Sequence, residues 1–297
     1  MSSISEPAHR PERPRMSKKT RDFITKAISH IFIIFFGAFM MYPIIWMFGA
    51  SLTPGVMIFS NTSVFPENPT FNNYIVGWQG IGRIPFSTFL INSGIISFAT
   101  IAGNLFSCAL AGYAFARLKF ALRNVWFAIM LLTIMLPGQV TLIPQYIMFL
   151  NYGWIDTYLP LIVPTFLATN SFFIFLMVQF IRGLPVHLDE AATIDGCNKF
   201  GIFTRIILPL CVPALVTLAI FSFLGSWDNF FGPLIYINTP SKFTVQLGVR
   251  MFRDATAESN WGPMFAMSIV TLLPPLIVFL SMQKYFVQGI STSGLKG

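Results

Sequence analysis

The stretch LDEAATIDGCNKFG, residues 188–201, is a polar segment set between long apolar ones. Acidic residues favour the first turn of a helix, where the helix dipole is positive, and Asp189 and Glu190 stand early in this stretch. Glycine often ends a helix in the left-handed conformation. The segment therefore predicts a short helix that begins near Pro185 and stops at Gly196, followed by a second helix that Asn198 caps and that runs toward the next proline.

The composition around this segment is that of a membrane protein. Of the 297 residues, 55% are hydrophobic and only 10% are charged, whereas a soluble domain has roughly 25% charged residues. Six stretches without Asp, Glu, Lys or Arg are each long enough for the ~20 residues that cross a bilayer. We therefore predict an all-α, polytopic membrane protein with six transmembrane helices, at about 28–50, 86–115, 124–149, 158–181, 206–225 and 263–284.

The distribution of positive charge predicts the orientation. An even number of spans puts both termini on one side, and with both in the cytoplasm fifteen of the nineteen Lys and Arg residues also lie there, as the positive-inside rule requires. The predicted parts are a basic, disordered cytoplasmic tail (1–26), a six-helix transmembrane domain (27–286) with a cytoplasmic loop (182–205), and a cytoplasmic C-terminal tail (287–297). Topology and contact with anionic lipid account for the net charge of +8, so we predict no nucleic-acid partner.

The third predicted span is interrupted. It contains Pro137, Gly138 and Pro144, which free backbone carbonyls that lipid cannot satisfy. We expect this span to face inward, against protein or a cavity.

Several kinds of chemistry are disfavoured. Apart from Lys284 at the inner end of the sixth, the six spans hold no acidic or basic side chain for an ion relay, and such a charge costs ~2.5–3.5 kcal/mol at the bilayer centre. The chain lacks the phosphate-binding pattern G-x-x-x-x-G-K-[ST]. His9, His30 and His187 are far apart, and no Cys/His spacing suits zinc. We predict that the chain is not an enzyme and binds no metal or cofactor.

The polar segment resembles a known signature. Glu190-Ala191-Ala192, Asp195-Gly196 and Ile207-Leu208-Pro209 are similar to the E-A-A…G…I-x-L-P pattern in the membrane subunits of bacterial ABC importers. Further stretches resemble the MalG-like subunits of the carbohydrate-uptake branch. They are YPIIWMFGASLTP (42–54), INSGI (91–95), YAFARLKF (113–120), IPQYIMFLNYGWIDTYLPLI (143–162), FLMVQFIRGLP (175–185) and YFVQGISTSGLKG (285–297).

This resemblance implies partners and residue roles. In that family the signature loop is a coupling helix that docks on a cytoplasmic ATPase, which assigns ATPase coupling to Glu190, Ala191, Ala192, Asp195 and Gly196. The family's C-terminal tail also reaches the ATPases, so the resemblance implies that four tail residues contact the ATPase subunits: Ser293, Gly294, Lys296 and Gly297. The implied partners are a homologous permease subunit, two ATPase subunits that bind ATP and Mg, and an extracytoplasmic solute-binding protein docking on loops 51–85 and 226–262. The implied location is the inner membrane.

The cargo path is predicted from polar and aromatic groups within the spans, because sugars offer hydroxyls to amides and C–H faces to indole rings. The candidates are Asn92, Gln139, Asn170, Trp227 and Asn229. Hydrogen bonds between helices and an interfacial aromatic belt are alternative roles for them. The expected cargo is a sugar or oligosaccharide, with a polyol, glycerol phosphate or acidic oligosaccharide as alternatives. A self-contained secondary transporter and an intramembrane enzyme are the rival functions.

Overall fold

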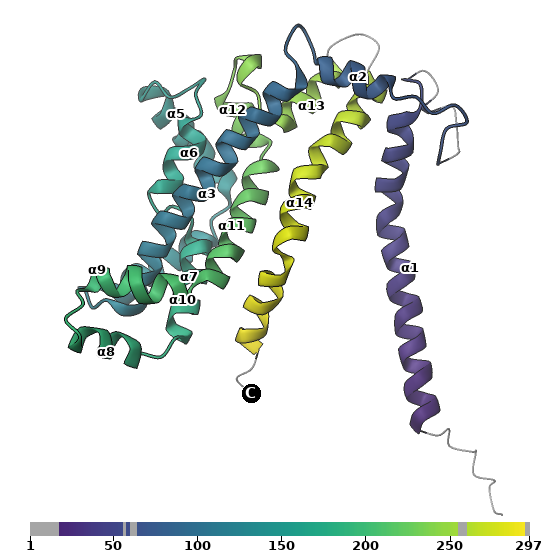
Figure 1. The fold of residues 1–297 in the computed structure, drawn as a ribbon. Coiled ribbons are helices and arrows are strands. Elements are labelled where there is room, and N and C mark those ends of the chain that lie inside the picture. The colour runs from purple at the N-terminus through teal and green to yellow at the C-terminus, as the bar shows by residue number, and fades with distance from the viewer. Residues whose placement is uncertain (1–17, 56–57, 60–63, 255–259, 295–297) are drawn as a thin grey trace, which may run out of the picture.

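The computed structural model describes residues 18–55, 58–59, 64–254 and 260–294, and its regular structure in these ranges is helical (Figure 1). The α-helices are α1 (Lys18–Leu52), α2 (Asn72–Gln79), α3 (Phe86–Arg117), α4 (Arg123–Ile134), α5 (Gly138–Asn151), α6 (Leu159–Phe166), α7 (Ser171–Gly183), α8 (His187–Ile194), α9 (Lys199–Ile202), α10 (Leu208–Leu210), α11 (Val212–Trp227), α12 (Phe231–Tyr236), α13 (Val245–Asp254) and α14 (Trp261–Gly294). A π-helical turn spans Phe203–Ile207 and a 3-10 turn spans Pro240–Lys242.

Helix α3 is the centre of the bundle, and α6, α7 and α11 pack around it (Figure 1). Small residues on α3 permit this close packing, as is common between membrane helices. A Cβ atom added at Gly112 would lie 2.5 Å from the Cβ of Met177 on α7, and one added at Gly103 would lie within 3 Å of the Phe166 ring on α6. Both contacts are too short for any side chain larger than hydrogen.

The bundle has two hydrophobic clusters, one at each end of α3. The inner cluster joins α3, α7 and the start of α11 through residues such as Cys108, Met177 and Leu218. The outer cluster joins α3, α11, α13 and α14. Its members include the fully buried Phe86 and Phe89. The middle of α3 lies between the clusters and carries polar residues.

Within the described residues, four helical segments are long and apolar enough to cross a membrane, and up to six are if each of two bent helix pairs counts as one span. The four are Asp22–Leu52, Phe86–Arg117, Leu159–Gly183 and Trp261–Gln283. The bent pairs are α4 with α5, at an angle of 101°, and Lys199–Leu210 with α11, at 77°. The chain is therefore an all-helical protein with four to six candidate spans.

The third predicted span is broken where its sequence indicated, between Ile134 and Gly138. We expected other parts of the protein to pack against this span, but this chain supplies little of that packing. Helix α4 has no buried residue, and Phe149 is the buried residue of α5. The break lies at the rim of the bundle because this chain supplies few neighbours for α4 and α5, and any further cover must come from outside it.

Two helices extend beyond the predicted spans. Helix α1 begins at Lys18, so residues 18–26 are helical where we expected a disordered tail, and residues 1–17 lie outside the described residues. No proline or glycine interrupts the chain between residues 18 and 36, so the helix continues past the apolar stretch. Helix α14 runs to Gly294. Of the predicted tail contacts, Ser293 and Gly294 close α14, and Lys296 and Gly297 lie outside the described residues.

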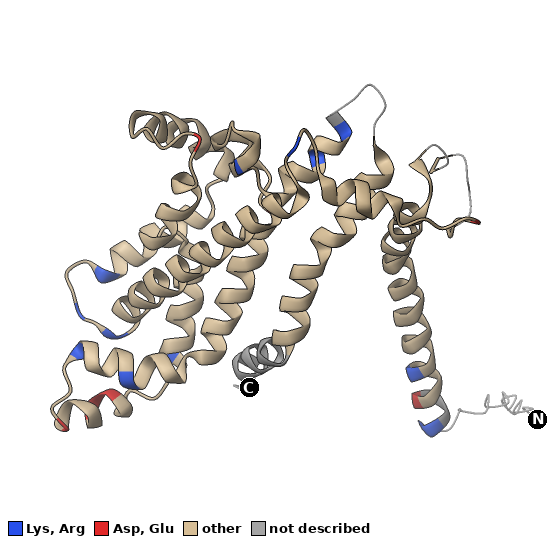
Figure 2. Cartoon of the chain, turned by 45° about the horizontal axis from the view of Figure 1, so that its top comes forward, with Lys and Arg blue, Asp and Glu red and all other residues tan. Residues whose placement is uncertain are grey.

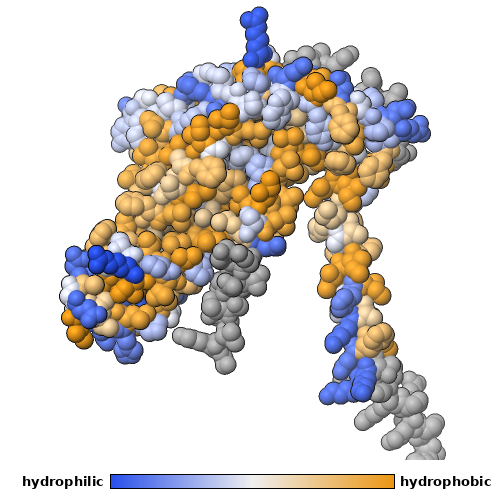
Figure 3. Space-filling view, viewed as in Figure 1, coloured by the Kyte–Doolittle hydropathy of each residue, from blue (hydrophilic) through white to orange (hydrophobic). Residues whose placement is uncertain are grey.

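Charge is confined to the ends of the bundle. Figure 2 shows Lys, Arg, Asp and Glu in the loops and at helix ends, with uncharged helices between them. Figure 3 shows the same band as an orange, hydrophobic flank. This pattern matches a hydrocarbon layer bounded by two polar interfaces.

Candidate functional site

Residues 182–205, called the coupling segment here after the role that the resemblance implies, have the predicted local structure. Asp189 and Glu190 lie in the first turn of α8. Gly196 follows the helix with φ +82, the left-handed conformation that glycine adopts without strain. The Asn198 side chain caps α9, because its Oδ1 accepts a hydrogen bond from the Gly201 amide at 2.7 Å. Helices α8 and α9, the two short helices of the coupling segment, form a corner at one end of the bundle (Figure 1).

One face of the coupling segment is buried in the bundle. Ala192 is 5% exposed and belongs to the inner cluster with Ile202 and Phe203. The Asp189 side chain also points inward, since its Oδ2 lies 3.1 Å from the Nε of Arg117 on α3. The predicted coupling residues therefore do not all lie on one face of the segment, since Ala192 lies on the face that is buried in the bundle.

The opposite face is exposed and partly apolar. Glu190, Ala191 and Asp195 are exposed. Ile194 is 87% exposed and Phe200 is 68% exposed. A contiguous exposed apolar patch is typical of an interaction surface, which makes this face a candidate contact surface. The sequence analysis missed Ile194 and Phe200, although both are apolar residues in an otherwise polar stretch.

A cavity of about 590 Å³, lined by both polar and apolar side chains, lies beside the middle of α3, between the inner and outer clusters. Helices α3, α4, α6, α7 and α11 contribute to its wall, and none of the lining residues is charged. Hydroxyl and amide side chains alternate with apolar ones. The polar lining residues are Thr100, Asn104, Thr133, Thr165, Thr169, Asn170, Ser171, Ser222, Ser226 and Asn229.

The polar side of α3 is one continuous stripe. Ser93, Ser97, Thr100, Asn104 and Ser107 follow one another at intervals of three or four residues, which places them on the same helix face. Four of them have partners: the Ser93 hydroxyl accepts from a backbone amide, and Ser97, Asn104 and Ser107 donate to other helices. The Thr100 hydroxyl is buried in the cavity wall and has no hydrogen-bond partner among the described residues. This stripe was readable in the sequence and was missed.

Two of the predicted path residues, Asn170 and Asn229, line the cavity. Each also fixes a helix start with its side-chain oxygen. Asn170 Oδ1 accepts from the Phe173 amide at 3.2 Å, and Asn229 Oδ1 accepts from the Gly232 amide at 3.0 Å. The Nδ2 groups make no hydrogen bond in the part of the chain that the structure describes, so they remain available as donors in the cavity wall.

The other three predicted path residues lie elsewhere. Asn92 donates from Nδ2 to the carbonyls of Ser241 and Phe243, both at 2.9 Å. The Trp227 indole is 4% exposed and donates to the Thr271 carbonyl at 3.1 Å. Both tie helices or loops together within the outer part of the bundle. Gln139 is exposed on α5 and does not line the cavity.

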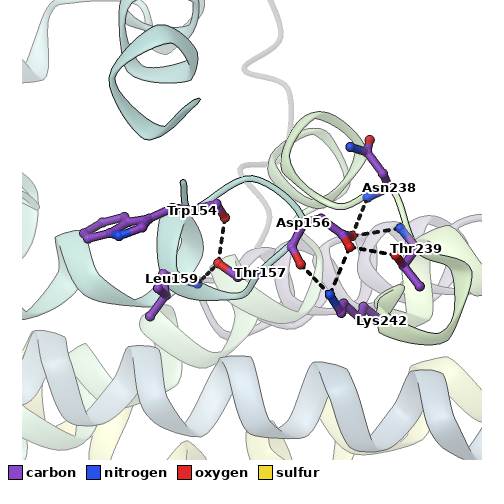
Figure 4. Close-up of polar contacts among 7 residues, drawn as sticks. All are labelled: Trp154, Asp156, Thr157, Leu159, Asn238, Thr239 and Lys242. Carbon is purple, nitrogen blue, oxygen red and sulfur yellow. Dashed lines mark hydrogen bonds and ion pairs between the residues drawn. The ribbon is translucent and has the colours of Figure 1, made fainter. Parts of the chain in front are cut away.

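At the other end of the bundle from the coupling segment, Asp156 joins two loops (Figure 4). Its carboxylate accepts from the amides of Asn238 and Thr239, from the Thr239 hydroxyl and from Lys242 Nζ, at 2.7 to 3.0 Å. The bonds from Thr239, then those from Lys242 and Asn238, hold the pKa of Asp156 well below its usual value. This contact fixes the loop before α6 against the loop after α12.

Comparison with known proteins identifies relatives of the whole chain. The family described as "binding-protein-dependent transport system inner membrane component" matches residues 103–292. The AraQ permease protein of the arabinooligosaccharide transport system of Halalkalibacterium halodurans is 32% identical over 287 residues, which are 95% of this chain and 100% of that protein.

Solved structures share the fold. A bacterial ABC transporter involved in importing the acidic polysaccharide alginate matches with a TM-score of 0.79 and 22% identity, over 92% of this chain and 100% of that one. The bacterial alginate transporter in complex with a periplasmic protein that carries an alginate pentasaccharide matches with a TM-score of 0.63 and 16% identity, over 89% and 93% of the two chains.

The chain belongs to the family of binding-protein-dependent transport system inner membrane components. It is a multi-pass inner-membrane protein of the sugar ABC transporter permease type. The resemblance recognised in the sequence is confirmed.

Proposed function

We propose that the chain is one of two homologous permease subunits of an ATP-driven importer, which together form the path for a sugar or oligosaccharide. Two cytoplasmic ATPase subunits hydrolyse the ATP, and an extracytoplasmic binding protein delivers the cargo. All six predicted spans cross the membrane, with both termini and the coupling segment in the cytoplasm. The break between α4 and α5 supports a second permease subunit, because its exposed backbone needs cover within a bilayer.

The observation that carries this proposal is the exposed face of the coupling segment. Ile194 lies at the end of α8, the helix of the exposed signature residues Glu190 and Ala191, and Phe200 lies in the next helix, α9; all four are exposed. A surface of this kind fits an apolar cleft with a polar rim on a partner protein. The chain lacks a phosphate-binding loop of its own, so we assign the energy source to that partner.

The cavity supports a neutral cargo. Its wall offers hydroxyls and amides, which can pair with sugar hydroxyls in both directions. A phosphate or uronate would enter this wall without a cation to pair with, and an unpaired charge is costly to desolvate. We therefore favour a neutral sugar or oligosaccharide over glycerol phosphate or an acidic oligosaccharide for this chain's half of the path. Asn170, Asn229 and Thr100 are its proposed contacts.

The coupling role is tested with Glu190→Ala. The Glu190 side chain is 65% exposed and contacts His187 at 3.2 Å, so its removal costs at most ~1 kcal/mol of folding stability. We expect a folded, inserted chain whose assembled complex loses cargo-stimulated ATP hydrolysis. Normal stimulation in the variant would contradict the assignment of Glu190.

The orientation is tested with the native thiol of Cys197, which lies in the coupling segment and is partly exposed, whereas Cys108 and Cys211 are buried. A membrane-impermeant maleimide should label inside-out vesicles and leave intact cells unlabelled. Labelling of intact cells would put the coupling segment on the wrong side for an ATPase.

The cargo path is tested with Thr100→Val, which removes the hydroxyl and keeps the shape. Because the Thr100 hydroxyl has no partner among the described residues, the folded chain should keep its stability. Uptake of neutral oligosaccharides by the reconstituted complex should show a raised KM. An unchanged KM for every neutral cargo that the complex transports would remove Thr100 from the path.

A further inference from the structure

The inner end of α3 holds the coupling segment through a buried ion pair. Arg117 is the last residue of α3 and its side chain is 8% exposed, while that of Asp189 on α8 is 13% exposed. The Nε of Arg117 lies 3.1 Å from Asp189 Oδ2. Within the described residues, no other cation contacts Asp189. The signature residues do not include this pair, and its members are far apart in the sequence.

The same arginine also holds the joint that precedes α8. Helix α7 ends at Gly183, and Leu184 leaves the helix with an extended backbone, ψ 143. Arg117 Nη2 donates to the Leu184 carbonyl at 2.7 Å. Arg117 therefore bridges both sides of the joint, with Leu184 before the turn and Asp189 after it. One turn earlier on α3, Tyr113 donates to the Lys199 carbonyl at 3.1 Å and so fixes the start of α9.

Helix α3 connects these contacts of Arg117 and Tyr113 directly to the cavity. It runs without a break from Phe86 to Arg117, and Ile96, Thr100 and Asn104 on it line the cavity. At 1.5 Å per residue, Arg117 stands about 25 Å from Thr100 along a single rigid rod. The route through α10 and α11 is less stiff, because it contains the π-helical turn and the 77° bend at Cys211.

We propose that Arg117 is a positioning residue that transmits movement of the coupling segment to α3, and through α3 to the cavity wall. When the ATPases displace α8, the Arg117–Asp189 pair and the Arg117–Leu184 bond carry α3 along as one body. Without them, α8 can turn about the Leu184–Pro185 joint, and α3 is held to the segment only through Tyr113 and the inner cluster, so less of the displacement reaches α3. This inference rests on the proposed function, since it assumes an ATPase that moves the coupling segment.

The test uses a reporter cysteine in the cavity wall. Gly225 lines the cavity, and a Cβ added there meets no atom within 4 Å, so Gly225→Cys is accommodated. The background carries Cys197→Ser, which leaves Cys108 and Cys211 buried. The rate of N-ethylmaleimide labelling at position 225 is measured in the complete complex, without nucleotide and with ATP trapped by vanadate. The ratio of the two rates reports how strongly ATP moves the cavity wall.

Arg117→Gln and Asp189→Asn are compared with Arg182→Gln. Arg182 is an exposed cation at the end of α7 that stacks over Phe127 at 5.0 Å and makes no ion pair with α8 among the described residues, so Arg182→Gln controls for the loss of a positive charge near α8. We expect both test variants to keep ATPase binding and basal ATP hydrolysis. Their ATP-dependent rate ratio should fall about fivefold or more, the lower range of allosteric coupling factors. Arg182→Gln should keep the parent ratio.

The double variant Arg117→Gln/Asp189→Asn separates transmission from stability. Removing both members of a buried pair often restores stability, so a purely structural pair would recover both thermal midpoint and rate ratio. Transmission through Arg117 predicts recovery of the midpoint alone, because the Leu184 bond is still missing. A parent-like ratio in either single variant, or in the double variant, overturns the inference. Failure of the parent complex to bind an ATPase would instead overturn the proposed function.

Discussion

The contact between α3 and α7 at Gly112 predicts a specific cost for one added methyl group. In Gly112→Ala the new Cβ would lie 2.5 Å from Met177 Cβ and 3.5 Å from the Val178 amide nitrogen. Favourable carbon contacts lie at about 3.5–4.0 Å, so the helices must separate by about 1 Å. Met177 Cβ is bonded to the backbone and cannot rotate away. Overpacking of this kind costs ~1–3 kcal/mol.

Gly94→Ala is the matched control. Gly94 lies in the same helix, and a Cβ added there meets no atom within 4 Å. Replacing a helical glycine by alanine gains ~1 kcal/mol of helix propensity at either position. The propensity gain therefore cancels in the comparison, and the difference between the two variants is the packing cost of ~1–3 kcal/mol.

Two native thiols report the unfolding. Cys108 and Cys211 are fully buried in the inner cluster, so in a Cys197→Ser background a thiol-reactive dye marks the loss of that cluster on heating. An unfolding entropy of about 2.1 cal/mol/K per residue gives roughly 1.6 °C per kcal/mol for the 297 residues. We therefore expect the apparent midpoint of Gly112→Ala to lie roughly 2–5 °C below that of Gly94→Ala at one scan rate. Equal midpoints, or a more stable Gly112→Ala, would refute the close packing of α3 on α7.

Three further outcomes are expected. Gly196→Ala forces alanine to a φ of +82 and should cost ~1–2 kcal/mol of folding stability. Gly183 has open space around it and no positive φ, so Gly183→Ala should cost little. The thiol-dye assay compares the unfolding midpoints of the two variants. Ile194→Asp changes an exposed side chain, so stability should stay within ~0.5 kcal/mol, while co-purification of the ATPase falls; undiminished co-purification would exclude Ile194 from the contact. Because the pKa of Asp156 is lowered on folding, its contribution to stability is complete above the unfolded value of about 3.9 and is lost as the pH falls through the folded value. Tryptophan fluorescence should therefore report a smaller loss of stability below pH 4 for Asp156→Asn than for the parent chain; identical acid profiles would contradict this.

Local features were predictable because they depend on neighbouring residues. The second span was predicted at about 86–115 and is α3, Phe86–Arg117. The prediction was close because Pro85 and Arg117 bound an uncharged stretch and so set where the helix begins and ends. The end of α8 at Gly196 and the Asn198 cap follow from single side chains acting on adjacent backbone.

Features that depend on distant residues were not predictable. Nothing in the sequence of 124–151 sets the bend between α4 and α5 at 101°, because the angle follows from packing. Asn92 and Asn229 are the same residue type, yet one binds loop carbonyls and the other lines the cavity. The pairing of Arg117 with Asp189 joins residues 72 positions apart, and only the folded bundle brings them together.

The position of the first helix, α1, depends less on the rest of the chain than that of the bundle helices does. Helix α1 is 35 residues long, about 50 Å at 1.5 Å per residue, and the apolar window within it has none of its residues buried by the rest of the chain. It stands apart from the bundle over its inner half (Figure 1). The rest of the chain therefore does little to set the tilt of α1. If the proposed partner subunits pack against it, the angle of α1 should be broadly distributed in the solitary polypeptide and narrow on assembly.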